Sequence, residues 1–319
     1  MFVLLIILLA GCSRQKAYTT DLFDYFDTYS SLTVCAGSPE EAERYAGLTR
    51  ALFEQYDALL DSFESHPGYV NLFDLNQAAG SGPVAVSREL YDFIAYGLDV
   101  YEITGHTVNI ALGPVLQLWQ QALNDEAHPL PDDEALRQAA LHTDPGDVIL
   151  NEKDCTVELR SADMALDAGA LAKGYVAALV EEALRGAGCK SALLSAGGNI
   201  LCIGNAPEGG DWRIGIRNPD YPDHSSTSIA QVLTVQDVSV VTSGDYERFF
   251  EKDGVRYHHL IDPETLYPGH LYRSVTIVCR DGAAADMLST ALFLMPRAEG
   301  EALASRYDAQ VIYMEGGMS

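Results

Sequence analysis

Apolar residues recur at helical spacing through the first half of the chain. In SPEEAERYAGLTRALFEQYDALLDSF, Ser38 is placed to cap a helix, Pro39 suits the first helical position, and Glu41 completes a capping box. A second helix is predicted in SRELYDFIAYGLDVYEITG, whose apolar residues share one face. A third helix begins near Gly113-Pro114, in GPVLQLWQQAL.

The pattern changes to short apolar runs from about residue 147 onward. The predicted strands are DVILN, CTVELR, SALLSAG, NILCIG, WRIGIRN, AQVLTV, VSVVTSG, YHHLID, SVTIVC and a last one, AQVIYM. Helices are predicted at about 169–187, 283–295 and 297–306. This irregular order predicts an α+β fold in which a mixed or antiparallel sheet is flanked by helices. Because no repeat and no long linker is found, we expect a single folded body.

The N-terminus MFVLLIILLAGCS is typical of the apolar core of a signal peptide. It ends in Leu9-Ala10-Gly11-Cys12, the pattern of a bacterial lipoprotein cleavage box, and it is too short to span a bilayer as a helix. We expect residues 1–20 to be a lipoprotein signal peptide and tether, with lipidated Cys12 holding residues 21–319 at the membrane outside the cytoplasm. A buried N-terminal strand is the alternative, since a basic segment before the apolar run is missing.

Charge and cysteine content narrow the possible functions. Acidic residues outnumber basic ones 46 to 20, and the net charge of -26 excludes a nucleic-acid binder because it repels phosphate backbones. A ligand that carries phosphate would need local cations or a bound metal.

The six cysteines lack zinc-ligand or redox spacing, and lipidation of Cys12 would leave an odd number. We therefore expect no disulfide framework, and we expect Cys155, Cys202 and Cys279 to be small core residues.

The segment AADMLSTALFLM contains a possible site for a hard cation. On a helix, Asp286 and Thr290 project from the same face, so that a carboxylate and a hydroxyl converge. Such oxygen ligands suit Mg²⁺ better than zinc. The alternative is structural: Asp286 would favour the helix N-terminus, and Thr290 would bond back to its own backbone.

The segment LDAGALAKGYVAALVEEAL predicts a turn into an apolar helix. Asp167 and the glycines Gly169 and Gly174 allow backbone groups to approach a ligand, and Lys173 supplies a mobile cation where phosphate could lie. The spacing matches neither a Walker sequence nor the dinucleotide fingerprint. An ordinary surface lysine at a helix start is the alternative interpretation.

Two further segments predict tight turns. SAGGNI places Gly197 and Gly198 between two strands, and FFEKDGVRYHHLID has Asp253-Gly254 at the centre of a hairpin. Alternation along the second strand of that hairpin sends His258 and His259 to opposite faces, which argues against a shared metal. A lone histidine on a strand serves either structure or catalysis.

Together these segments resemble the ApbE family, the FAD:protein FMN transferases. The resemblance is ordered along nearly the whole mature chain and rests on these blocks: GPVLQLW, LDAGALAKGY, SAGGNI, TSGDYERFF, YHHLIDPET and ADMLSTALF. It implies that residues 21–319 form an enzyme that uses FAD and Mg²⁺. It further implies transfer of FMN to a Thr or Ser of an acceptor flavoprotein, such as a subunit of a membrane electron-transfer complex, with release of AMP.

The resemblance also implies roles for individual residues. The metal ligands would be Asp286, Thr290 and the backbone carbonyl of Ala170. Residues at FAD-contacting positions are Asp167, Lys173 and Leu260, with Phe63 and the segment Leu118-Trp119-Gln120 matching more loosely. His259 matches the histidine of the family's His-Ile-x-Asp-Pro block, whereas His258 does not and is expected to be expendable.

Two positions depart from the family's pattern. Phe26-Asp27-Thr28 stands where the family often has Met-Gly-Thr, and Phe26 falls at a position expected to contact the flavin or adenine. Leu266 replaces the glycine of the usual Thr-Gly-Tyr-Pro. That turn must therefore be built without its glycine.

Our mechanistic hypothesis is that His259 accepts the proton of the incoming hydroxyl, directly or through water. Asp262 would either orient this histidine or support the turn. Two rival functions share the same residues: a hydrolase that splits FAD into FMN and AMP, and a lipoprotein that binds FAD without catalysis.

Overall fold

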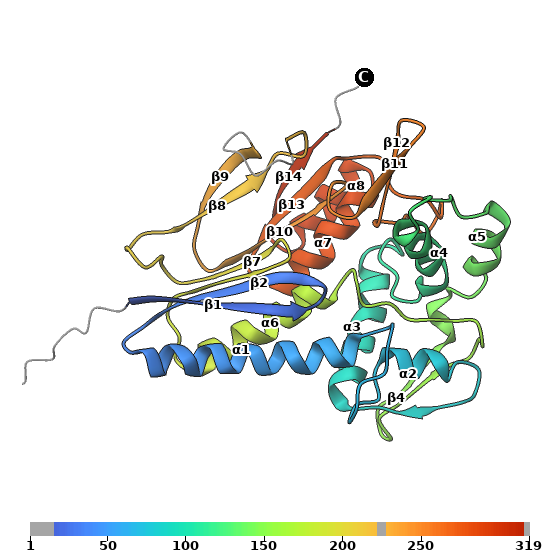
Figure 1. Ribbon diagram of the computed structural model, residues 1–319, viewed down its shortest axis with the longest axis horizontal. Coiled ribbons are helices and arrows are strands. Elements are labelled where there is room, and N and C mark those ends of the chain that lie inside the picture. Colours follow the sequence, from blue (N-terminus) through green and yellow to red (C-terminus); the bar gives the residue numbers. More distant parts are fainter. Residues whose placement is uncertain (1–15, 222–227, 316–319) are drawn as a thin grey trace, which may run out of the picture.

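The computed structural model describes residues 16–221 and 228–315, and its largest element there is a seven-stranded antiparallel sheet (Figure 1). In spatial order the strands are β1 (Lys16–Tyr25), β2 (Thr28–Ala36), β6 (Ala192–Ala196), β7 (Asn199–Ile203), β10 (Val238–Gly244), β13 (Ser274–Cys279) and β14 (Gln310–Met314). Every neighbouring pair is antiparallel. The predicted α+β fold is confirmed. A mixed or an antiparallel sheet was expected, and the sheet is antiparallel.

Helices cover one face of this sheet, and a small ribbon covers part of the other (Figure 1). The helices are α1 (Pro39–Leu60), α6 (Ala172–Gly186) and α7 (Gly282–Leu294), with α8 (Arg297–Ser305) packed against α7. The ribbon pairs β8 (Trp212–Arg217) with β9 (Ile229–Val235), and Trp212 packs over Cys202 and Val240 of the sheet. Because α7 has sheet on one side and helices on others, almost all of its side chains are buried.

A second group of elements extends from the C-terminal end of α1 (Figure 1). It contains α2 (Leu72–Gln77), α3 (Arg88–Ile103), α4 (Gly113–Asn124), α5 (Asp133–Ala140), the 3₁₀ turn η1 (Pro145–Asp147) and the small sheet of β3 (Val84–Ala85), β5 (Thr156–Leu159) and β4 (Val148–Asn151). The hairpin of β11 (Phe249–Lys252) and β12 (Val255–His258) shares a hydrophobic cluster with α4.

Most predicted elements are confirmed, but the N-terminal hairpin was missed. Residues 16–20, which were assigned to the tether, begin β1, because this stretch pairs with β2 and alternates exposed with less exposed side chains. Cys12 and the predicted cleavage box lie outside the described residues. Within the described ranges, the helices are all too short or too polar to cross a membrane.

Local chemistry explains the boundaries of several elements. Ser38 caps α1 by accepting from the Glu41 N–H at 3.2 Å, although the Glu41 carboxylate accepts from Gly37 and not from the cap residue. Asp253 and Gly254 both have positive φ, at 52° and 78°, which fits a tight hairpin turn between β11 and β12. The predicted N-cap and hairpin turn are thus confirmed, whereas the predicted capping box does not form, because the Glu41 carboxylate bonds to Gly37 and not to Ser38.

The cysteines of the described residues are all free, as expected. Cys202 and Cys279 are buried core residues. The expectation for Cys155 was wrong: it is only partly buried, because it precedes β5 in a turn with φ of 51°.

Helices α6 and α7 approach each other closely at Gly174. A Cβ atom at this position would lie 2.2 Å from the Cβ of Asp286 and 2.8 Å from the Gly282 carbonyl oxygen. These neighbours are backbone or short, stiff groups. The close approach of the two helices therefore depends on the missing side chain.

We expect Gly174→Ala to lower the free energy of unfolding by roughly 1–3 kcal/mol, since the added methyl group must push the helices apart. The measurement is urea denaturation followed by circular dichroism. Gly186→Ala is the matched control at the end of the same helix, where a Cβ has nothing within 4 Å. It should be neutral or slightly stabilising; equal losses for both variants would contradict the packing argument.

Candidate active site

The N-terminus of α6 makes a direct hydrogen bond to α7. The Gly174 N–H donates to Asp286 Oδ2 at 2.6 Å. Helix α6 begins at Ala172 with Leu171 as its N-cap, so the Gly174 N–H is one of the first N–H groups of the helix, which have no intrahelical partner. The Ala170 carbonyl lies before the N-cap and is therefore outside the hydrogen-bond ladder of α6.

Thr290 lies one turn after Asp286 on α7, and both side chains are buried. Its Oγ1 is 3.4 Å from Ser243 Oγ, which has a shorter contact of 2.8 Å with Ser289 Oγ. The structural alternatives do not account for this pair. Asp281, not Asp286, caps α7, and it is Ser289 whose hydroxyl bonds back to the helix backbone, on the Asp286 carbonyl.

These groups form a set of hard oxygen donors. The Asp286 carboxylate has a single backbone donor, the Thr290 hydroxyl has only a long contact, and the Ala170 carbonyl lies outside the hydrogen-bond ladder of α6. Carboxylate, hydroxyl and carbonyl oxygens are the ligands that Mg²⁺ prefers. The donor chemistry of the residues present therefore fits a magnesium ion.

The two candidate carboxylates are held away from bulk solvent. Burial raises the pKa of Asp286, while the Lys173 charge, the Gly174 N–H and the Asn199 amide oppose that rise. Asn199 lies near the carboxylate, but its Nδ2 makes no hydrogen bond of normal geometry to the described residues. Burial also raises the pKa of Asp167, which accepts the Gly169 N–H at 2.8 Å. A nearby cation would strengthen the charged form of each.

Lys173 is the cation that these groups share. Its charge lowers the pKa of Asp167, Asp286 and His259, so it acts electrostatically on all three. In the described part of the chain it makes no ion pair or hydrogen bond through its side chain. Its position at the start of α6 is as predicted, but it is half-buried in the site and not an ordinary surface lysine.

His259 follows β12 directly and lies beside this group. Burial, His258, Lys173 and Arg248 together lower its pKa to about 3. Its Nδ1 is enclosed and makes no hydrogen bond of normal geometry to a described residue, although the Arg248 carbonyl raises the pKa slightly. The imidazole is therefore neutral at physiological pH, and it does not titrate near neutrality in this state of the protein.

His258 has a structural role that its sequence position did not suggest. Its ring is 2% exposed; Nε2 is 2.7 Å from the Gly269 carbonyl oxygen, and Nδ1 accepts the Leu260 N–H at 3.2 Å. These partners require the neutral tautomer with the proton on Nε2. The ring also packs edge-on against Phe293 of α7, at 5.4 Å between centroids. The expectation that His258 is expendable is wrong for the structure of this loop.

Asp262 supports a turn instead of orienting His259. Its Oδ1 accepts the Glu264 N–H at 2.8 Å, its N–H donates to the Tyr267 carbonyl, and its own carbonyl accepts from Leu266. Leu266 adopts a left-handed conformation, with φ of 64°, and its carbonyl accepts the Trp119 indole N–H at 2.8 Å. The structural alternative for Asp262 is thus the one supported by the contacts.

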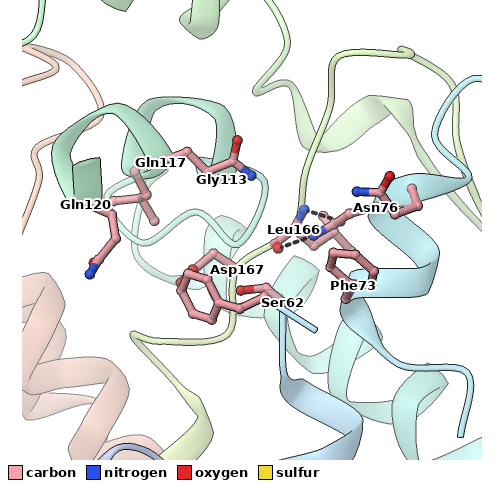
Figure 2. A pocket seen from close by; sticks show the side chains of 11 residues that line it. Ser62, Phe73, Asn76, Gly113, Gln117, Gln120, Leu166 and Asp167 are labelled. Carbon is pink, nitrogen blue, oxygen red and sulfur yellow. Dashed lines mark hydrogen bonds between the residues drawn. The ribbon is translucent and has the colours of Figure 1, made fainter. Parts of the chain in front are cut away.

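A cavity of about 230 Å³ opens beside Asp167 (Figure 2). It is lined by Ser62, Phe63, Phe73, Asn76, Gln77, Gly113, Leu116, Gln117, Gln120, Leu166 and Asp167. Asn76 holds the wall in place, because its amide bonds to both backbone groups of Leu166, at 2.7 and 2.9 Å (Figure 2). The cavity is smaller than the roughly 300–1,000 Å³ of pockets that enclose a whole ligand, so it suits one ring system of a larger molecule.

Of the three predicted contacts on α4, Gln120 lines the cavity, whereas Leu118 and Trp119 do not. Gln120 lines it, together with Gly113, Leu116 and Gln117, which follow helical spacing on one face. Trp119 lies on the opposite face and is buried in a hydrophobic cluster, against which Leu118 also packs. The side chains of Trp119 and Leu118 are therefore core residues and not cavity contacts.

Among the other predicted contacts, Phe63 lies at the cavity, and Leu260 and Phe26 do not. Phe63 lines the cavity and is exposed, on a loop where Asp61 accepts the N–H groups of Phe63 and Glu64 and pairs with His66 at 2.8 Å. These bonds account for the clustering of Asp61, Glu64 and His66, whose ligand atoms lie within 4.8 Å of one another.

Leu260 and Phe26 are held by the fold and lie outside the cavity lining. Leu260 is buried in the main core. Phe26 packs its ring against Phe53 at 5.5 Å. Sequence reasoning missed Asn76 and Phe73, since neither lies in one of the recognised blocks; helical spacing on α4 was the signal that could have found Gln117 and Leu116.

Comparisons with known proteins agree with this geometry. The ApbE family model matches residues 26–314. A FAD:protein FMN transferase of Klebsiella pneumoniae is 34% identical over 291 residues, which cover 90% of this chain and 89% of that protein. One from Treponema pallidum is 41% identical over 235 residues, 69% of this chain and 64% of that protein. The crystal structure of the ApbE protein of Thermotoga maritima superposes with a TM-score of 0.80 at 25% identity, covering 93% and 94% of the two chains.

We expect His258→Ala to lower the free energy of unfolding by roughly 2–4 kcal/mol, because it leaves the Leu260 N–H and the Gly269 carbonyl without partners. Chemical denaturation measures the loss. His270→Ala is the control: its ring is exposed and lies 6.3 Å from that of His258. If both variants unfold at the same denaturant concentration, the structural role of His258 is refuted.

The pKa of His259 predicts a pH dependence of stability. An unfolded histidine takes up a proton below its usual pKa of 6.5, whereas folded His259 stays neutral down to about 3. This residue therefore lowers stability as pH falls through that window. Between pH 6 and 5, His259→Asn should lose about 1 kcal/mol less than the wild type.

Denaturation curves at the two pH values test this difference. The raised pKa values of Asp167 and Asp286 act in the opposite direction but are common to both proteins. Equal pH slopes would mean that His259 is not buried as a neutral group.

Proposed function

The chain belongs to the ApbE family, and from this we propose that it transfers FMN from FAD to a Thr or Ser hydroxyl of an acceptor protein. The observation that carries the proposal is the convergence of four groups at the N-terminus of α6. The hydrogen bond from Gly174 joins α6 to Asp286, Thr290 follows on the same face of α7, and the Lys173 charge reaches both Asp286 and His259. The cavity beside Asp167 adjoins this group.

Mg²⁺ would be held by the Asp286 carboxylate, the Thr290 hydroxyl and the Ala170 carbonyl. When bound, the ion would offset the charge of the FAD diphosphate and of the leaving AMP. The protein has a net charge of -26, so a diphosphate needs such local compensation. Lys173, with no carboxylate paired to it in the described residues, adds a second positive charge at the same place.

The transfer step breaks the phosphoanhydride bond of FAD and forms a phosphoester bond to the acceptor. The acceptor hydroxyl oxygen attacks the FMN-side phosphorus, the bond from that phosphorus to the bridging oxygen breaks, and AMP leaves. His259 accepts the hydroxyl proton. Burial is the main cause of its low pKa, and Lys173 and Arg248 add to it, so a negative diphosphate placed between them would oppose their effect and raise the pKa.

The cavity beside Asp167 would hold one ring system of FAD. Phe63, Phe73 and Leu116 offer apolar surface for an aromatic ring, and the Gln117 and Gln120 amides offer hydrogen bonds at its edge. Because the volume is small, the rest of FAD would extend past Asp167 toward Lys173. That direction brings the diphosphate to the metal ligands.

The cellular location follows from the N-terminal sequence. Leu9-Ala10-Gly11-Cys12 supports cleavage before Cys12 and its lipidation, which would anchor the folded body at the membrane outside the cytoplasm. Acceptors in that compartment would be membrane-associated flavoproteins, such as subunits of electron-transfer complexes.

The proposal is tested by mixing the protein with FAD, Mg²⁺ and an acceptor that carries a Thr or Ser flavinylation motif. Covalent flavin fluorescence of the denatured acceptor measures transfer. We expect His259→Ala to reduce the rate about 100-fold or more while FAD still binds, as loss of a general base does. Asp286→Asn should abolish the dependence on added Mg²⁺ together with activity.

His106→Ala, an exposed histidine at the end of α3, is the matched control and should transfer at the wild-type rate. Retained activity in His259→Ala would remove the proton-acceptor assignment. Rapid AMP release without any acceptor would favour a hydrolase, and FAD binding with neither product would favour a binding protein.

A further inference from the structure

We propose that Arg248 binds the diphosphate of FAD and that Asp27 competes with this diphosphate for the Arg248 guanidinium. The inference rests on FAD as the substrate of the site described above. It adds a second cationic contact from the hairpin of β11 and β12, opposite the one from α6, and it assigns a role to the residue that replaces the family's glycine at position 27.

The main chain of Arg248 is fixed beside the candidate base. Its carbonyl accepts the His259 N–H at 3.2 Å, which ties the start of β11 to the residue that follows β12. The side chain, in contrast, is 53% exposed. Among the described residues its guanidinium makes no hydrogen bond, and its one ion pair is with Asp27 at 4.0 Å. A fixed backbone with a poorly held guanidinium is suited to capture a ligand.

The charge of Arg248 reaches the centre of the site. It lowers the pKa of Asp167 and of His259, the two groups on which Lys173 also acts. Lys173, at the start of α6, and Arg248, directly before β11, thus act electrostatically on the same two residues. A diphosphate beside His259 would lie within reach of both.

Three neighbouring arginines form shorter ion pairs than Arg248 does. Arg217 pairs with Glu247 at 3.1 Å, Arg256 with Glu251 at 2.8 Å, and Arg273 with Asp245 at 2.7 Å. Their guanidinium groups are already engaged by carboxylates at hydrogen-bonding distance. Arg248 has only the long contact with Asp27, so binding a ligand costs it little.

Asp27 is held in place by the tip of the β1–β2 hairpin. Phe26 and Asp27 both adopt left-handed conformations, with φ of 52° and 50°. The Phe26 N–H donates to Asp57 Oδ1 at 2.7 Å, and the Phe26 ring packs on Phe53. Asp27 itself is exposed, so its carboxylate stays at the edge of the site.

The exchange is favourable for physical reasons. An exposed ion pair at 4.0 Å contributes little. A diphosphate carries more charge and offers oxygens that match the planar guanidinium in a bidentate arrangement. The ion pair with Asp27 is therefore weak enough for the FAD diphosphate to displace Asp27 from Arg248.

Equilibrium binding separates the diphosphate from the flavin. The affinities of FAD, ADP and riboflavin, each with Mg²⁺, are measured by titration calorimetry for the wild type, Arg248→Gln and Arg217→Gln. We expect Arg248→Gln to weaken FAD and ADP about 10-fold and to leave riboflavin unchanged, the size of effect of one charge-assisted contact. Arg217→Gln, with the same change in net charge, should bind all three as the wild type does.

The role of Asp27 is tested in two backgrounds. Asp27→Asn, which keeps a residue that tolerates positive φ, should tighten ADP binding several-fold in the wild type and have no effect in Arg248→Gln. Arg248→Lys should fall between the wild type and Arg248→Gln, because it keeps the charge but loses the planar fork.

Equal ADP affinities in Arg248→Gln and Arg217→Gln would overturn the contact. An equal effect of Asp27→Asn in both backgrounds would overturn the competition, since only general charge would then be acting. These measurements need no acceptor and no turnover. Failure of FMN transfer with an Arg248-dependent affinity for ADP would therefore reject the proposed function and leave this contact in place.

Discussion

The site depends on one hydrogen bond, from the Gly174 N–H to Asp286 Oδ2. It brings the N-terminus of α6, where free N–H groups favour negative charge, against a buried carboxylate of α7. The contact is possible only because residue 174 has no side chain. The Gly174 N–H is one of the first donors of α6, which have no partner within the helix, and the carboxylate satisfies it. The close approach of the two helices thus places Asp286 at the start of α6, next in the chain to Lys173.

The sequence predicted the parts of the site that depend on local periodicity. Asp286 and Thr290 share a helix face, and Asp253-Gly254 forms a tight turn, because spacing along one element determines both. It could not predict which face of α4 meets the cavity, so a recognised block included both Gln120, which lines the cavity, and Trp119, which does not. That choice is made by packing between α4 and the β11–β12 hairpin, far apart in the chain. The antiparallel order of the sheet likewise depends on pairing between strands that are far apart in the chain.

The two departures from the family's pattern have a common physical explanation. Asp27 and Leu266 stand where glycine is usual, and both keep the left-handed backbone, with φ of 50° and 64°. Such a conformation costs a residue with a side chain about 1–2 kcal/mol. Each is held by a neighbour: the Asp57 carboxylate fixes the residue before Asp27, and the Trp119 indole bonds to the Leu266 carbonyl. Both turns are therefore built in this chain without a glycine at these positions.

The basic residues at the site differ in their ion pairing from many of the other basic residues. Of the 20 basic residues, ten form an ion pair within 4.0 Å in the described part of the chain, and all ten are arginines. Lys173 has none paired to it in the described residues, and Arg248 has only a distant one. Both act on His259, whose pKa is lowered first by burial and then by His258, Lys173 and Arg248. A substrate diphosphate beside these two cations would meet positive charge that forms no close ion pair in the described residues, which favours anion binding in an otherwise acidic protein.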